Sequence, residues 1–353
     1  LNPTATERDS DYLWSEQSAG VGHFAKYADQ RVSEADNENL LVQLAMEYSA
    51  KTGKPIDQRA IDNVTKEIQQ DIDTKETRRV YDSPSKGVLW GWEVPAYVWT
   101  KAIATGTFLM MAVWHFFNGG IDASSELTGL IITLVFMGLT GALLVKDLDR
   151  PDRFLYVLLR PQWKSWLVRG AYIITGFGGF VTLKLLDKYF RLGLEWLWWP
   201  GAVFAVMGAV YTAFLFNQAR ARDLWQIPIQ SAIHMLVHAL MAGSVAMMVI
   251  APETRESMAH ILLWGIVLNM FFIAKEIFMP HDTPDTKKAI HLMTKGYYSK
   301  YFWAGIALGS VIPIIILNTM SESTTLIAGG LILIGIFLTE FVRIRVPQMI
   351  PLS

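Results

Sequence analysis

Hydrophobic residues gather in eight long runs that fill the last three quarters of the chain. The runs lie near 94–118, 124–145, 165–186, 195–219, 224–251, 256–279, 300–319 and 323–342. Each has about 20 residues or more, and a helix that rises about 1.5 Å per residue then crosses a hydrocarbon layer about 30 Å thick. The pattern therefore predicts an all-α integral membrane protein with about eight transmembrane helices, arranged as two four-helix bundles in a lipid bilayer.

Tryptophans mark many ends of these runs, as in the aromatic belt where membrane helices meet water. They are Trp90, Trp92, Trp196, Trp198, Trp199, Trp225 and Trp303. The belt and the length of the runs exclude a soluble helical protein.

The first 89 residues differ in composition from the rest. They contain 16 acidic and 11 basic residues, whereas the remaining 264 contain 16 and 20. Ser33–Asp36 resembles a capping box and predicts one short helix, and isoleucines and a valine at spacings of three and four predict a second. We expect 1–89 to be an acidic soluble arm that docks on a partner, 90–345 the membrane domain and 346–353 a C-terminal tail. The alternative for the arm is a mobile tail, because its hydrophobicity is low.

Lysine and arginine are unevenly divided between the two sides of the predicted bundle. One side receives the loop 146–164, the loop 280–299 and four arginines, whereas the other receives four basic residues. We call the first side the loop face. The positive-inside rule predicts a cytoplasmic loop face and two cytoplasmic termini, in a multi-pass protein of the cell inner membrane.

The chain has no cysteine. This excludes disulfides, thiolate zinc sites and cysteine-ligated iron–sulfur clusters within it. The first 30 residues lack the apolar core of a signal peptide, so none is expected. No phosphate-binding glycine loop, nucleophile elbow or metal-ligand cluster occurs, and no nucleic-acid partner is expected.

Three polar residues share one face of the first run. Glu93, Tyr97 and Lys101 follow one another at steps of four, and Lys101 lies about 12 Å from the loop face at about 1.5 Å per residue. Ionisable groups at this depth are costly and usually functional. The alternative is a structural ion pair between Lys101 and a carboxylate of a neighbouring helix.

A second polar stripe occupies the fifth run, with Gln226, Gln230, His234 and His238 at steps of four. The stripe must face the bundle interior, either as interhelical hydrogen bonds or as a proton relay suited to the pKa of histidine. Two histidines of one helix cannot be the two axial ligands of one haem. His115 and His260 both fall near the opposite face and could pair, but axial ligation is a demanding geometry and no haem is expected.

The loop between the second and third runs carries the most specific motif, Lys146-Asp-Leu-Asp-Arg-Pro-Asp-Arg-Phe, which continues to Gly170. It resembles the D-L-G-R-P-E-R-F loop of the NrfD/PsrC family, with Asp149 in place of Gly and Asp152 in place of Glu. Residues 91–106 are similar to that family's first membrane helix. The resemblance covers about residues 88–345 and leaves out the arm.

The resemblance implies a membrane subunit of a respiratory-type oxidoreductase that binds a quinone, either menaquinone or ubiquinone. Electrons would pass between the quinone and a ferredoxin-like 4Fe-4S subunit on the loop face, and a separate catalytic subunit would complete the enzyme. By position, Glu93 and Tyr97 match family residues that contact the quinone head group, although the usual Asn and His are absent. Tyr211 matches a tyrosine that donates to a quinone carbonyl, or it is a core tyrosine.

Quinone binding is thus expected at Glu93, Tyr97, Lys101 and Tyr211, and proton relay at Lys101, Gln230, His234 and His238. Two other function classes compete with this reading. A secondary transporter would use the same buried groups as substrate or proton sites, but no internal repeat or broken pair of helices is visible. A structural anchor without quinone chemistry would have no need of ionisable groups in lipid.

Overall fold

The computed structural model describes residues 90–148, 151, 154–219, 222–278, 283–318 and 322–350. All regular secondary structure in these ranges is helical. The arm 1–89 with its two predicted helices lies outside the described residues, and so do Asp149 and Asp152 of the loop motif.

Eight helices in the described ranges are long and apolar enough to cross a membrane, which confirms the prediction. The seventh is continuous in space but consists of three pieces (α12, η5 and α13). The spanning elements are α4 (Glu93–Asn118), α5 (Ala123–Asp147), α7 (Trp166–Phe190), α8 (Trp198–Asn217), α9 (Pro228–Ile250), α10 (Arg255–Phe278), α12 (Ser299–Ile306), η5 (Ala307–Val311), α13 (Ile312–Leu317) and α14 (Glu322–Arg345).

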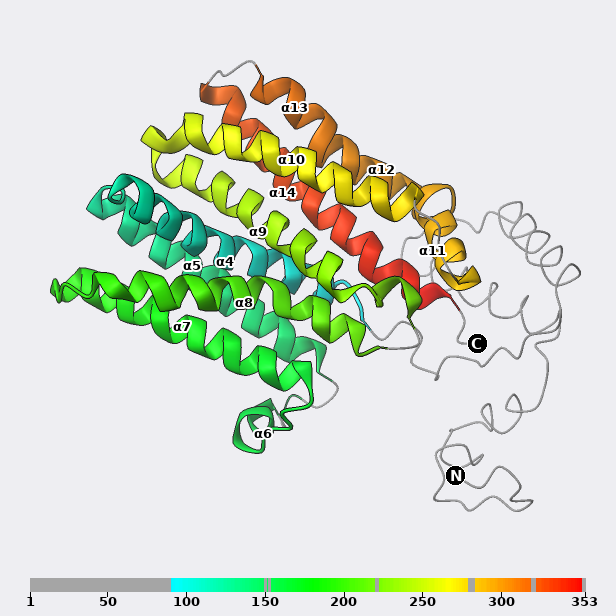
Figure 1. Ribbon diagram of the computed structural model, residues 1–353, viewed down its shortest axis with the longest axis horizontal. Coiled ribbons are helices and arrows are strands. Elements are labelled where there is room, and N and C mark those ends of the chain that lie inside the picture. Colours follow the sequence, from blue (N-terminus) through cyan, green and yellow to red (C-terminus); the bar gives the residue numbers. More distant parts are fainter. Residues whose placement is uncertain are drawn as a thin grey trace, which may run out of the picture. The chain divides into compact units, whose positions relative to one another are not determined.

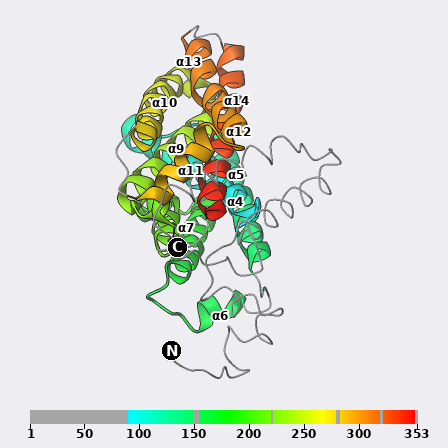
Figure 2. The same cartoon turned by 90° about the vertical axis from the view of Figure 1, so that its right-hand side faces the viewer.

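Short helices connect the spans. Figure 2 looks along the bundle from the loop face, where α6 and α11 lie beside the ends of the long helices. The connecting elements are α6 (Phe154–Leu159), η2 (Glu195–Leu197), η3 (Asp223–Trp225), η4 (Pro252–Thr254), α11 (Pro284–Thr294) and η6 (Val346–Met349).

Two groups of four helices meet along α4 and α9 (Figure 1). The first group is α4, α5, α7 and α8, and the second is α9, α10, α12–α13 and α14. The two central helices touch backbone to backbone at Gly106 and Gly243, since a Cβ on Gly106 would lie 1.8 Å from the carbonyl oxygen of Ala239. Small residues allow such close approach, and packing rather than hydrophobic burial holds helices together in lipid.

The seventh span widens into a π-helical turn at η5, just before Pro313 of α13. Proline has no N–H and its ring displaces the preceding turn, which accounts for the interruption. At this turn Gly309 lies against Gly335 of α14, where an added Cβ on Gly335 would lie 2.2 Å from the Cα of Gly309. The wide turn directs Ser310 into the bundle interior, where it is buried.

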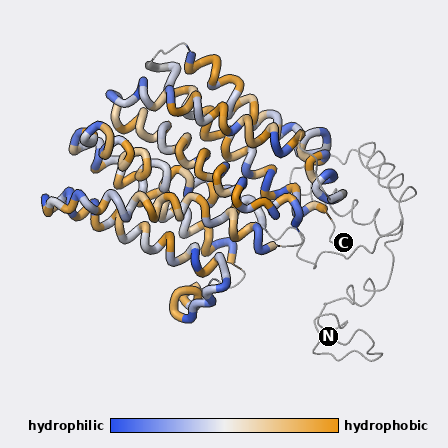
Figure 3. The backbone as a smooth tube through the Cα atoms, in the orientation of Figure 1, coloured by the Kyte–Doolittle hydropathy of each residue, from blue (hydrophilic) through white to orange (hydrophobic). Residues whose placement is uncertain are grey.

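The outer surface is apolar. In the most hydrophobic 18-residue stretch of the central helix α4, 89% of the residues are buried, whereas the share for α5 is 22%, and Ile131, Val135 and Leu139 are exposed there. Hydrophobic residues occupy the middle of the helices and hydrophilic residues their ends (Figure 3). This distribution matches lipid around the helices, and the exposed Trp92, Trp196, Trp199 and Trp303 match the aromatic belt. Trp198 and Trp225 differ from the expectation, because they are buried in the protein.

The expected C-terminal tail begins with an ordered turn. Within η6, Val346 and Pro347 are buried. Gln348 exchanges hydrogen bonds with the backbone of Trp90, and Arg222 donates to the carbonyl of Pro347 at 3.0 Å. These contacts tie the loop-face ends of α4, α8 and α14 together, while 351–353 lie outside the described residues.

Candidate functional site

Lys101 lies deep between α4 and α8 and is 2% exposed. Its ammonium group donates to the carbonyl oxygen of Ala209 at 3.0 Å and to the hydroxyl of Thr212. The same nitrogen lies 4.6 Å from the centre of the Tyr211 ring. No ion pair of Lys101 is found among the described residues, but Glu340 of α14 lines the same small cavity, so a structural pairing with this carboxylate stays the alternative.

Tyr211 of α8 stands beside Lys101. It is buried, and its hydroxyl finds no hydrogen-bond partner among the described residues. A buried unpaired hydroxyl typically costs about 1–3 kcal/mol, so this donor is available to a ligand. Gly170 of the loop motif makes room for the ring, since a Cβ there would lie 2.2 Å from a Tyr211 ring carbon.

The other two predicted quinone contacts have different surroundings. Tyr97 is buried in an apolar cluster with Phe216 and Trp225 near the loop face. Glu93 lies nearer the surface, with one oxygen 3.4 Å from the ammonium of Lys146 on α5. The structure thus brings Lys101 and Tyr211 into contact, while Glu93 is engaged in an ion pair at the end of the bundle.

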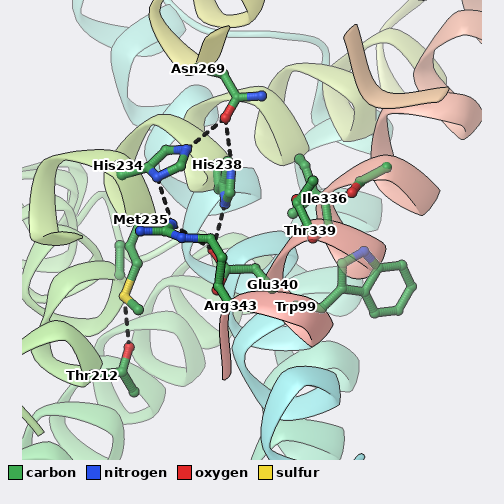
Figure 4. Close-up of polar contacts among 12 residues, drawn as sticks. Trp99, Thr212, His234, Met235, His238, Asn269, Ile336, Thr339, Glu340 and Arg343 are labelled. Carbon is green, nitrogen blue, oxygen red and sulfur yellow. Dashed lines mark hydrogen bonds and ion pairs between the residues drawn. The ribbon is translucent and has the colours of Figure 1, made fainter. Parts of the chain in front are cut away.

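The two histidines of α9 are the centre of a buried polar cluster, shown in Figure 4. His234 Nε2 lies 2.6 Å and His238 Nε2 2.9 Å from the side-chain oxygen of Asn269 on α10. From α14, Arg343 Nη1 lies 2.6 Å from His234 Nδ1, and Glu340 Oε1 lies 2.9 Å from His238 Nδ1, though not with the angles of a well-aligned hydrogen bond. We call these five residues the histidine network.

Two further groups border the histidine network. Arg343 forms an ion pair with Glu276 of α10, with a closest contact of 3.1 Å. Asn269 donates its amide to Ser310 Oγ of the π turn at 3.4 Å. Sequence patterning missed Asn269 and Glu340, although an acid inside an apolar run is the signal that singled out Lys101, and it counted Arg343 only among the basic residues of the loop face.

The glutamines of the predicted stripe are not part of this network. The helix α9 begins at Pro228, because proline is favoured at the first position of a helix. Gln226 therefore precedes the helix. The Gln226 amide donates to the carbonyls of Asn217, Ala219 and Arg222 and closes the turn after α8. Gln230 lies on the first turn of α9 and is partly exposed.

Two small cavities adjoin the network. One, of about 10 Å³, is lined by Lys101, His238, Met235 and Glu340. The other, of about 20 Å³, is lined by Met235, Glu340 and Arg343 and reaches Trp225 of η3 at the loop face. A single water molecule needs about 10–15 Å³ of this kind of space, so each cavity is water-sized. Lys101 and the histidine network therefore belong to one polar region.

The opposite end of the first group holds a separate charged cluster. Lys184 is fully buried and lies 2.9 Å from Asp187 and 2.8 Å from Glu195. His115 stacks on Trp198 there and lies 3.8 Å from Glu195. These ion pairs join α4, α7 and η2. None of them includes Lys101 or a residue of the histidine network.

The described residues contain no group of three or more His, Asp or Glu side chains arranged to hold a metal ion. No curated protein matches the chain. The family described as polysulphide reductase, NrfD, matches residues 82–351, which is most of the chain and includes every membrane span. With eight apolar helices and a polar interior region beneath the loop face, this chain belongs to the NrfD family of multi-pass membrane proteins.

Proposed function

We propose that this chain exchanges electrons between a membrane quinone and an iron–sulfur subunit docked on its loop face, within a larger oxidoreductase complex. Family membership supports the general role, and the observation that carries the proposal is the Lys101–Tyr211 pair. An ammonium group and an unpaired phenol meet there among mostly apolar side chains. Ligand sites of this kind combine apolar walls with a few convergent polar groups.

The two side chains supply what quinone chemistry requires of a protein. A quinone oxygen accepts hydrogen bonds, and the phenol of Tyr211 is free to donate one. The ammonium of Lys101 is a second donor and holds a proton that can move to a developing oxygen anion. Electrons have to come from a partner, because the chain has no cysteine with which to ligate a cluster. We assign catalysis on the other substrate to a further subunit.

The cavities beside Lys101 are water-sized, so entry of a quinone head group requires side chains to move. Met235 is suited to this, because it lines both cavities and methionine adapts its shape readily. Its sulfur accepts a hydrogen bond from Thr212, which also contacts Lys101. Movement of Met235 would therefore change the hydrogen bonding of Lys101 through Thr212.

Purification of the native complex through this chain tests the proposal. We expect an iron–sulfur subunit, a catalytic subunit and bound quinone to co-purify, and no haem in the isolated chain. A secondary transporter would bring neither partners nor quinone, and a structural anchor would bring the partners alone. A stoichiometric haem in the isolated chain would contradict the assignment.

The orientation of the chain is a separate proposal, based on the basic residues of the loop face. Reporter domains fused after Ser353 and inserted within 286–295 are expected to give cytoplasmic signals, because lysine- and arginine-rich loops are retained on that side. If both reporters are exported, the topology is inverted and the partners bind at the outer face.

We also propose that the acidic arm contributes to docking. Deletion of 1–89 is expected to reduce recovery of the iron–sulfur partner in co-purification, because an arm of net charge about −5 on the basic loop face would provide a second contact surface. Membrane insertion of the eight spans should remain, which protease protection would show. Full recovery of the complex with the truncated chain would mean that the arm is dispensable.

A further inference from the structure

Arg343 determines which ring nitrogen of His234 carries a hydrogen. A guanidinium group has donors only, so His234 Nδ1, 2.6 Å away, has to accept. The hydrogen of a neutral His234 is therefore on Nε2, which donates to the side-chain oxygen of Asn269 at 2.6 Å. This orients the Asn269 amide, whose nitrogen then faces Ser310.

The orientation of Asn269 in turn constrains His238. Its Nε2 lies 2.9 Å from the same Asn269 oxygen and has to donate as well. Its Nδ1 lies 2.9 Å from Glu340 Oε1. A neutral imidazole with its hydrogen on Nε2 would hold its Nδ1 lone pair beside a carboxylate oxygen, which is repulsive. One additional proton between the two atoms removes the repulsion, either on the imidazole or on the carboxyl group.

Glu340 also occupies the boundary between the two cavities. The cavity lined by Trp225 and Arg343 approaches the loop face, and the cavity lined by Lys101 and His238 lies deeper. Both are the size of a water molecule, and a water held there by the few polar side chains of the lining can pass protons between groups that do not touch. Glu340 is thus placed between the loop face and Lys101.

We propose that His238 and Glu340 form a proton-exchange pair that delivers protons from the loop face to Lys101. The route to Lys101 rests on the proposed quinone function, whereas the shared proton does not. When Lys101 gives its proton to a quinone oxygen, the pair returns one to Lys101 and is recharged from the loop face. Complete reduction takes two electrons from the iron–sulfur partner and two protons by this route.

Charged groups surround the pair, and Arg343 Nη1 lies 3.8 Å from Glu340 Oε1, so Glu340 also takes part in the ion pairs of Arg343. The charged and titratable groups packed around it come from four helices: Lys101 of α4, His234 of α9, Glu276 of α10 and Arg343 of α14. Arg343 is paired with Glu276 and blocks His234 from taking a proton at Nδ1. His234 is therefore a positioning residue that holds Asn269, and His238 with Glu340 exchanges the proton.

Infrared difference spectra recorded as the pH is changed test the shared proton directly. We expect the purified complex in lipid to show a carboxylic-acid carbonyl band that changes together with imidazole bands as the pH is varied. Both sets of bands should be lost in Glu340→Gln, and the carbonyl band should move in Glu340→Asp. The matched control is Glu195→Gln at the opposite end, which should leave the bands unchanged.

The same variants separate proton delivery from quinone binding. Glu340→Gln should slow quinone turnover by at least about ten-fold, because positioned acid–base groups contribute about 10²–10⁴-fold, and should alter its pH profile. Retention of the carbonyl band in both Glu340→Gln and His238→Gln would overturn the proposed pair. If the bands behave as expected but changes at Lys101 and Tyr211 leave quinone turnover intact, the proton pair stands and the proposed quinone site fails.

Discussion

Replacement of Lys101 by Met or of Tyr211 by Phe is expected to slow quinone turnover by about ten-fold or more. Loss of one hydrogen bond to a ligand costs about 0.5–1.5 kcal/mol, and up to about 3 kcal/mol where a charge takes part. About 1.4 kcal/mol corresponds to one decade in rate or affinity. Steady-state oxidation or reduction of a soluble quinone analogue by the purified complex measures the effect.

Two controls make this result specific. Activity of the partner subunits with an artificial electron acceptor should be unchanged, because the variants leave the loop face intact. Tyr172→Phe removes a phenol that donates to the carbonyl of Leu158 on the surface, and it should keep full quinone activity. If the variant at Lys101 or at Tyr211 keeps full activity, that residue does not belong to the quinone site. If both variants keep full activity, the histidine network is the next candidate for the site.

The second large effect is expected from Gly106→Ala. A Cβ at this position would lie 1.8 Å from the carbonyl oxygen of Ala239, a backbone atom of α9 that cannot turn aside. The two central helices would have to separate, and overpacking of this kind costs about 1–3 kcal/mol and occasionally more. Because α4 carries Lys101 and α9 carries His238, we expect a lower melting temperature and weaker quinone turnover together.

Gly138→Ala is the matched control for this change. Gly138 also lies within a membrane helix, α5, but no atom lies within 4 Å of its added Cβ. Alanine is a better helix former than glycine by about 1 kcal/mol, so this variant should be as stable as the natural chain or slightly more so. Thermal unfolding of the detergent-purified proteins compares the two. Equal melting temperatures for both variants would mean that the close contact of α4 and α9 does not limit stability.

Several features of the site could be foreseen from single residues and several could not. Lys101 could be identified because an ionisable group in an apolar run is costly, and the structure places it against the ring of Tyr211. The backbone carbonyl of Ala209 on α8 that accepts from Lys101 could not be foreseen, because every residue has a carbonyl and the pattern of side chains does not mark which one will bind. Gln226 was assigned to a helical stripe, yet the chain turns at Pro228 and uses the amide to close that turn.

By itself, the sequence determined the helical membrane fold, the eight spans and membership in the NrfD family, because run length and loop motif are local properties. Only the tertiary structure decided how α4, α9, α10 and α14 face one another. Hydrogen bonds such as those of His234 and His238 to Asn269 join positions more than 30 residues apart, and helix rotation and glycine contacts set their geometry. The pairing of His238 with Glu340 therefore became visible only once the helices were packed, because in lipid polar groups find partners across helices rather than in water.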